Sequence, residues 1–290
     1  KDAQAAALLL GLGRAQAATL EALYMQEADA SLDRAFEYYV EVGDVAKAVE
    51  VAAIHESQGG PSESKGQRIA RTLALVPPNS YEAGRLYARQ IVYLGEVRGD
   101  YEAARQTFSR ALEIAQREQD AGLEMETLVD MGHVDAYHLR LEDNLEREQS
   151  AFEVAREVDR PLAEVHAHYE IANVLFGMGN LMEAEQHASA SLAPAERSGL
   201  FWTVNALRIN ETVACAKGDW ATARNFSDRG LELSPRNPGL LGSRAILEHQ
   251  VGNFAQGEAH LERLIEAVHQ AAPGTPLLRG GGTPAVVIPM

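Results

Sequence analysis

A glycine followed by Asp or Asn recurs along the 290 residues, and its spacing limits what this chain can fold into. The steps between successive copies are 56, 80, 39 and 34 residues. A degenerate copy at Leu139-Arg140 divides the step of 80 into two steps of 40. Self-similarity at such a period is typical of repeat architectures, in which each copy is one supersecondary unit. The clear copies are Gly43-Asp44, Gly99-Asp100, Gly179-Asn180, Gly218-Asp219 and Gly252-Asn253.

We call each Gly-Asp or Gly-Asn pair, and the degenerate pair Leu139-Arg140, a mark. At fixed distances after each mark, the side chains are of similar size and polarity. Glycine tolerates the positive φ that ends a helix, and Asp or Asn accepts backbone N–H bonds at the start of the next helix. Two residues after the first position of a copy the side chain is apolar or aromatic: Val45, Tyr101, Leu141, Leu181, Trp220 and Phe254. Five residues after it the side chain is small in five of six copies: Ala48, Ala104, Ala184, Ala223 and Gly257, against Asn144. Because a small residue lets two helices cross closely, each mark predicts an antiparallel helix pair.

The segments between the marks have helical periodicity. Tyr101, Ala104, Phe108 and Ala111 follow one another at three- and four-residue steps, which is one face of an α-helix. No convincing alternation with a period of two indicates a strand. One helix pair cannot bury its own apolar face, so copies must stack. We therefore predict an all-α fold, a right-handed superhelix of stacked antiparallel helix pairs. Pro194 lies late in one expected helix and predicts a kink or an early end there.

The marks also divide the chain. We expect a helical-repeat domain over 1–271, with degenerate first pairs over 1–78 and clearer repeats over 80–271. Prolines and glycines crowd 272–290, which predicts a linker or the start of a truncated further repeat. The chain opens at Lys1-Asp2 with neither Met nor a signal-like segment, and we expect a cytoplasmic piece of a larger protein.

Charge and cysteine content exclude several classes of function. The formal net charge is −16, which argues against non-specific binding to nucleic acid or to an anionic membrane, since both need basic patches. No apolar run reaches the roughly 20 residues that a membrane span needs. Cys215 is the one cysteine, so no internal disulfide forms. Nucleic acid and membrane are therefore not expected partners.

Motifs for catalysis, cofactors and metals are missing. Gly11-Leu12-Gly13 lacks the Lys-Ser/Thr of a phosphate loop, and neither a Gly-x-Ser-x-Gly elbow nor a His-Glu-x-x-His zinc motif occurs. Five of the nine histidines fall between 133 and 187, but neither His133 with His138 nor His166 with His168 shares a helix face. A metal site would need ligands from different helices. We predict no catalytic residue, no cofactor and no metal site.

These marks resemble the tetratricopeptide repeat (TPR). The family pattern is met in full by Gly99, Asp100, Tyr101, Ala104, Phe108 and Ala111, and its closing proline by Pro235. Most steps are nearer 40 residues than the family's 34. The first-helix signature also departs, because Asn210 and Glu211 stand where Leu and Gly are usual.

Longer and looser repeats of this kind resemble the helical region of large bacterial signalling ATPases. These are the LuxR-type ATP-binding regulators and the class III cyclases with the same layout. The resemblance rests on residues 8–16, 31–44, 74–78 and 228–231. It implies a signal-transducing, transcription-regulating parent protein and a position downstream of a flanking ATPase module. It transfers no ATPase, cyclase or DNA-binding activity, since the residues for those are not in this chain.

In TPR stacks the first helices line a concave groove, at positions 13, 10, 6 and 3 residues before the glycine. These offsets select side chains rich in Arg, His, Tyr and Asn, and Tyr and Arg are enriched in recognition hot spots. The candidate groove residues are Arg89, Tyr93, His133, Tyr137, His166, Tyr169, Asn173, Asn205 and Arg208. They predict a site for a protein segment or a small effector.

The expected function is a non-catalytic scaffold, by resemblance the sensor arm of a multidomain signalling ATPase. One alternative is a structural spacer that holds flanking domains apart. Another is a helical-repeat enzyme whose site the sequence does not reveal, which would need convergent titratable groups in one pocket. The Asp and Glu excess fits either a solvated outer face or a basic partner segment.

Overall fold

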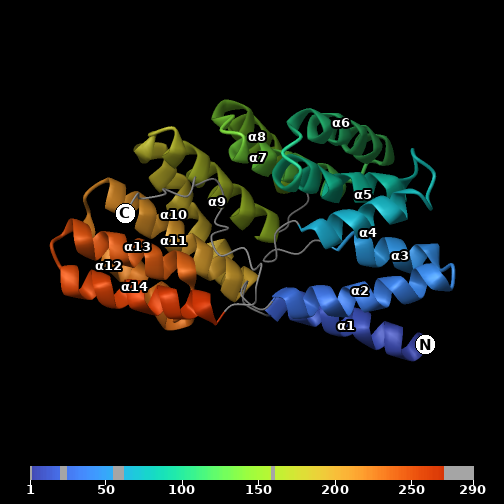
Figure 1. Cartoon of the computed structure of the whole chain (residues 1–290). Helices are drawn as coiled ribbons and strands as arrows, with labels where there is room; N and C mark the ends of the chain where they lie inside the picture. The colour runs from blue at the N-terminus through green and yellow to red at the C-terminus, as the bar shows by residue number, and fades with distance from the viewer. Residues whose placement is uncertain (1, 20–24, 55–61, 158–160, 271–290) are drawn as a thin grey trace. The chain divides into compact units, whose positions relative to one another are not determined.

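The computed structural model describes residues 2–19, 25–54, 62–157 and 161–270, and this part of the chain is built from helices without a strand. The helices belong to two compact units, one up to residue 139 and one from residue 140 onwards (Figure 1). The predicted all-α class is confirmed. None of the described helices is long and apolar enough to cross a membrane. The predicted linker over 272–290 lies outside the described residues.

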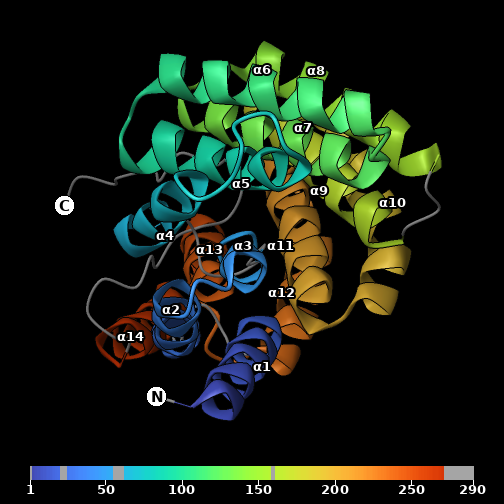
Figure 2. The same ribbon diagram turned by 90° about the vertical axis from the view of Figure 1, so that its right-hand side faces the viewer.

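The first unit contains seven described α-helices and one π-helical turn. Helix α2 packs on α1 and on α3, and α5 packs on both α6 and α7 (Figure 2). The helices are α1 (Ala3–Thr19), α2 (Met25–Glu41), α3 (Val45–Ala52), α4 (Glu63–Leu73), α5 (Tyr81–Val92), α6 (Tyr101–Glu118) and α7 (Ala121–Tyr137), with the π-turn Tyr93–Val97 after α5.

The second unit contains seven α-helices among its described residues. Each packs on its neighbour along the chain, and short turns make successive helices antiparallel (Figure 1). Helix α11 also packs on α9 and on α13, two steps away in each direction. The helices are α8 (Leu141–Glu157), α9 (Pro161–Gly177), α10 (Leu181–Ser198), α11 (Leu200–Ala216), α12 (Trp220–Leu233), α13 (Pro238–Gln250) and α14 (Phe254–His269).

The recurring marks are the turns that join helices. The glycines of the five clear copies have φ between +66° and +82°, in the left-handed region. In four copies the next N–H donates to the carbonyl five residues earlier, as in Asn180 to Leu175 (2.9 Å) and Asp219 to Ala214 (3.0 Å). This bond satisfies a carbonyl that the helix end leaves free. In all six copies the next helix begins at the predicted apolar or aromatic residue.

The second residue of the mark caps the following helix where it is Asp but not where it is Asn. Asp44, Asp100 and Asp219 accept bonds from backbone N–H groups three residues on, at 3.0–3.1 Å. Asn180 and Asn253 make no such bond, so the predicted Asn caps are wrong. The Asn253 side-chain amide donates to Oε2 of the buried Glu248 of α13 at 2.9 Å.

The small residues after the marks lie at close helix crossings. Ala48, Ala104, Ala184 and Ala223 are fully buried. At the fifth copy a Cβ on Gly257 would come within 2.4 Å of the His249 ring. A larger side chain at these positions would hold the paired helices apart, as the sequence pattern predicts.

A π-helical turn interrupts the first-helix pattern before Gly99. The turn Tyr93–Val97 adds a residue, so the N–H of Asp100 bonds to the carbonyl of Leu94, six residues earlier rather than five. Positions upstream of it are therefore rotated relative to the offsets counted back from the glycine.

Pro194 does not end its helix. Helix α10 continues past it to Ser198, so the predicted early end is wrong. Pro194 and the following Ala195 are buried, and this packing offsets the hydrogen bond that a proline cannot donate.

The degenerate copy generates a stability prediction. Leu139 has φ +58°, the conformation that glycine adopts in the other copies, and its side chain is 66% exposed. Replacing Leu139 with Gly removes the steric cost of that conformation and little packing. We expect Leu139→Gly to stabilise the chain by up to about 1 kcal/mol in thermal unfolding.

The reverse substitution at an intact mark is the matched control. A Cβ on Gly179 meets no atom within 4 Å, so only its φ of +80° opposes a side chain there. Gly179→Leu is expected to destabilise by about 1 kcal/mol or more. A loss of stability in Leu139→Gly would contradict the conformational argument.

Candidate functional site

Helices α9 and α11 of the second unit carry five of the nine predicted groove residues, namely His166, Tyr169, Asn173, Asn205 and Arg208. We call the surface formed by His166, Tyr169, Trp202, Asn205 and Arg208 the α9–α11 face. The two helices pack on each other although α10 separates them in the sequence. They are successive first helices of the repeat, so side chains from two copies meet here.

An aromatic group occupies one end of this face. The Trp202 ring lies edge-on to His166, with ring centroids 4.9 Å apart, and to Tyr169 at 6.1 Å. Phe201 is the next aromatic neighbour, at 5.2 Å. Trp202 and His166 remain half-buried, whereas Tyr169 is 3% exposed. Trp202 is therefore a surface side chain, and its contacts with His166 and Tyr169 fix the orientation of its ring.

Arg208 occupies the other end. Its guanidinium donates to the Tyr169 hydroxyl and lies 5.8 Å from the centre of the Tyr169 ring. A Cβ on Gly239 of α13 would come within 3.1 Å of the Arg208 Cδ, so glycine makes room for the side chain. Burial raises the pKa of Tyr169, and the nearby Arg208 charge opposes this shift. The phenol is neutral, and its oxygen accepts the hydrogen bond that holds the Arg208 guanidinium in place.

The predicted amides have local roles. Asn173 Nδ2 donates to the Tyr169 carbonyl at 2.9 Å, and Asn173 is 3% exposed. Asn205 Nδ2 donates to the Phe201 carbonyl at 3.0 Å but stays half-buried. Asn173 is thus a packing residue, and Asn205 keeps its carbonyl end for other contacts. His166 Nε2 lies 3.9 Å from Glu170 Oε1, one helical turn further on.

In the first unit Arg89 forms a buried ion-pair group on α5 and α7. Its Nη1 lies 2.7 Å from Asp130 Oδ2, and its other terminal nitrogen contacts Glu126. Arg89 is about one tenth exposed. Burial raises the pKa of Asp130 to about 6, and the Arg89 charge opposes the shift. The predicted ligand residue Arg89 is thus already paired within the fold.

The three remaining predicted residues lie in different surroundings. Tyr93, in the π-turn, donates to Glu63 Oε1 at 3.1 Å, and its ring fills the space beside Gly66 of α4. Tyr137 is 58% exposed at the end of α7 and stacks edge-on to His138. His133 is half-buried on α7. Arg89 and Tyr93 both precede or open the π-turn, so the offsets counted back from Gly99 are displaced for both.

The sequence offsets missed Trp202. It lies 16 residues before Gly218, one turn beyond the outermost offset, and three residues before Asn205 on the same helix face. Extending the offset series by one turn would have found it. Asp130 was also missed, because nothing in the sequence shows which carboxylate an arginine from another helix will meet. Glu170 was missed although it follows His166 by four residues on α9, a spacing that the sequence does show.

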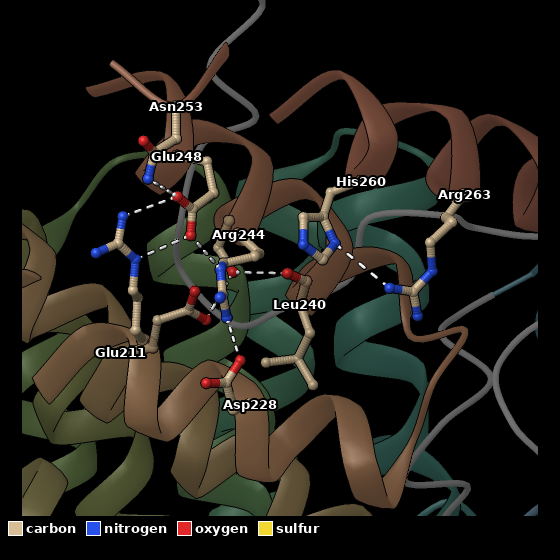
Figure 3. A network of polar contacts seen from close by, with 10 residues as sticks. Glu211, Asp228, Leu240, Arg244, Glu248, Asn253, His260 and Arg263 are labelled. Atoms are coloured by element: carbon tan, nitrogen blue, oxygen red, sulfur yellow. Dashed lines mark hydrogen bonds and ion pairs between the residues drawn. The ribbon is translucent and has the colours of Figure 1, made fainter. Parts of the chain in front are cut away.

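A buried polar network holds α11 to the helices packed around it (Figure 3). Glu211, fully buried, accepts from the Ser243 hydroxyl at 2.7 Å. Arg244 of α13 bonds to Asp228 of α12 at 2.6 Å and to Glu248 at 2.7 Å. The Asn210 amide, one residue before Glu211, donates to the Ala188 carbonyl of α10 at 2.7 Å. The departures from the TPR signature at Asn210 and Glu211 therefore build inter-helix bonds that fix α11.

Comparison with known proteins shows the fold. No protein-family model and no curated protein sequence matches the chain. Among solved structures it is similar to a Signal Transduction ATPase with Numerous Domains (STAND) protein with a tetratricopeptide repeat sensor from Pyrococcus horikoshii. The TM-score is 0.65 at 15% identity, covering 91% of this chain and 41% of that one. The chain thus spans less than half of that protein's length.

Two further structures are similar over most of their own length. Aspartyl phosphate phosphatase F from Bacillus subtilis matches with a TM-score of 0.63 at 14% identity, over 92% of this chain and 71% of that one. A Rap protein complexed with competence and sporulation factor matches with 0.56 at 13%, over 93% and 88%. At these identities the likeness shows a TPR-like helical-repeat fold, as the sequence predicts.

Glu211 generates a pH prediction. Burial raises its pKa from the ordinary 4.5 to about 7, and the bond from Ser243 opposes the shift. The folded chain therefore keeps a proton through a window in which the unfolded chain loses it. Stability falls as pH rises from about 4.5 to about 7 and stays lower above.

Glu211→Gln keeps a neutral side chain at every pH. We expect it to remove this part of the decline and to be more stable than wild type at pH 8 by roughly 1–3 kcal/mol. Unfolding followed between pH 4 and 8 measures this, with the exposed Glu232→Gln on α12 as control. Equal pH slopes in wild type and Glu211→Gln would contradict the assignment.

Proposed function

We propose that the chain is a non-catalytic scaffold whose α9–α11 face binds a segment of a partner protein. The observation that carries the proposal is the position of Trp202, half-buried between His166 and Tyr169, with Arg208 anchored on the same face. Trp, Tyr and Arg dominate binding energy in interfaces when their conformation is fixed in advance. Here Tyr169 and Arg208 are already held by each other, so binding orders few side chains.

The structural neighbours support this proposal. The STAND protein carries its tetratricopeptide repeats as a sensor, and the Rap protein was solved in complex with competence and sporulation factor. The net charge of −16 adds a long-range attraction for a basic segment. The proposed partner is therefore a protein segment with basic residues and an aromatic or aliphatic anchor.

The proposed parent is a multidomain signalling ATPase of the LuxR-type regulator or cyclase-linked kind, in which this region is the sensor arm. The resemblance of residues 31–44 and 74–78 to those proteins supports this assignment. The repeats would have two arrangements, one docked on the ATPase and one undocked. A segment bound to the α9–α11 face shifts the balance between them only by the difference in its affinity for the two.

A displayed peptide library tests the binding function. Peptides selected on the chain are measured by the fluorescence of Trp202 in a Trp220→Phe background, since the chain has two tryptophans. Trp202→Ala, followed by competition with a labelled peptide, is expected to weaken binding by about 30-fold or more, and Arg208→Ala by about tenfold.

Phe254→Ala is the matched control, because Phe254 is an exposed aromatic residue on α14, away from the α9–α11 face. It is expected to leave the affinity unchanged. A library that yields no peptide, or peptides whose affinity survives both Trp202→Ala and Arg208→Ala, would contradict the proposal and favour a spacer.

A further inference from the structure

Two histidines face each other between α9 and α10. The Nδ1 atoms of His168 and His187 are 3.1 Å apart, and the ring planes make an angle of 57°. Residues two apart on a helix point about 200° from each other, so His168 lies on the side of α9 opposite to His166. This pair is therefore separate from the α9–α11 face.

The orientation of the two rings suits a shared cation. Two facing Nδ1 atoms can hold one hydrogen between them, since two N–H groups would repel. Without that hydrogen, both lone pairs point to the same space. A tetrahedral Zn²⁺ bonds imidazole nitrogen at about 2.1 Å, which puts two ligand nitrogens about 3.3 Å apart. The observed 3.1 Å needs only a small adjustment.

Each histidine has a glutamate one turn before it on its own helix. Glu164 precedes His168 and Glu183 precedes His187, both by four residues, which places each pair on one helix face. Glu164 also lies 3.9 Å from Arg197 Nη2. Among the described residues, neither glutamate forms a group with both histidines whose ligand atoms lie within 4.8 Å of one another, so water supplies the oxygen ligands.

The surroundings give the pair a fixed orientation and a path to solvent. The Phe152 ring of α8 lies 4.9 Å from His168 and limits its rotation. His187 lines an open cleft of about 500 Å³ together with Glu146, Ser150 and Glu153 of α8. Three acidic or polar side chains on the far wall draw a hydrated cation toward the histidines.

We propose that His168 and His187 bind a divalent transition-metal ion such as Zn²⁺ or Ni²⁺, with water completing the shell. Imidazole suits these ions, whereas Ca²⁺ and Mg²⁺ need mainly oxygen ligands. The bound ion links α9 to α10. The sequence favoured no metal site, because it could not show that histidines 19 residues apart would meet.

Calorimetric titration of the whole chain with Zn²⁺ and with Ni²⁺ tests the site. We expect one ion per chain, release of water or protons rather than any covalent change, and no comparable binding of Ca²⁺. His168→Gln and His187→Gln should each weaken binding at least about tenfold, and the double variant should bind no better than either. Zn²⁺ should also raise the thermal midpoint of wild type but not of the double variant.

Two controls make the result specific. His260→Gln on α14 removes a histidine remote in sequence and should leave the affinity unchanged. Glu185→Gln on α10, whose carboxylate pairs with Lys217, should likewise leave it unchanged. Wild-type affinity in the His168→Gln/His187→Gln double variant would mean adventitious binding and overturn the site.

Discussion

A left-handed residue at the end of each first helix is the constraint on which the rest of the structure depends. It lets the chain reverse within two residues, so the next helix starts at once and runs back along the first. The small side chain three residues into that helix then allows a close crossing. Leu139 adopts the same left-handed conformation without being glycine, although that conformation is less favourable for leucine.

Stacking by this rule places equivalent positions of successive first helices side by side. Helix α9 therefore lies against α11, and Tyr169 meets Trp202 and Arg208 although more than 30 residues separate them. One turn after Arg208, Glu211 accepts a hydrogen bond from Ser243 of α13, and Asn210 donates one to α10. Helix α11 thus carries residues that hold the stack as well as residues proposed for recognition. The pairing of α9 with α10 brings His168 to His187 by the same packing.

Much of the fold could be predicted because it depends on interactions between residues close together in the sequence. Turn glycines, the apolar residue that opens each second helix and the small residue at the crossing all act within six residues of one another. Features that depend on partners from elsewhere did not follow. The offsets selected Arg89, but only the structure shows that Glu126 and Asp130 already pair with it. The π-turn at Tyr93–Val97 shifts the offsets counted back from Gly99, and no local pattern predicted it.

The central claim is that the α9–α11 face is the binding surface, and the indole signals of the two tryptophans test it most directly. Trp202 lies on that face, whereas Trp220 opens α12 and packs with Ala223 and Leu247. In ¹H–¹⁵N spectra of the chain titrated with a selected peptide, the Trp202 indole resonance is predicted to shift saturably while that of Trp220 stays in place. A shift of Trp220 alone, or saturation of binding with Trp202 unmoved, would contradict the account.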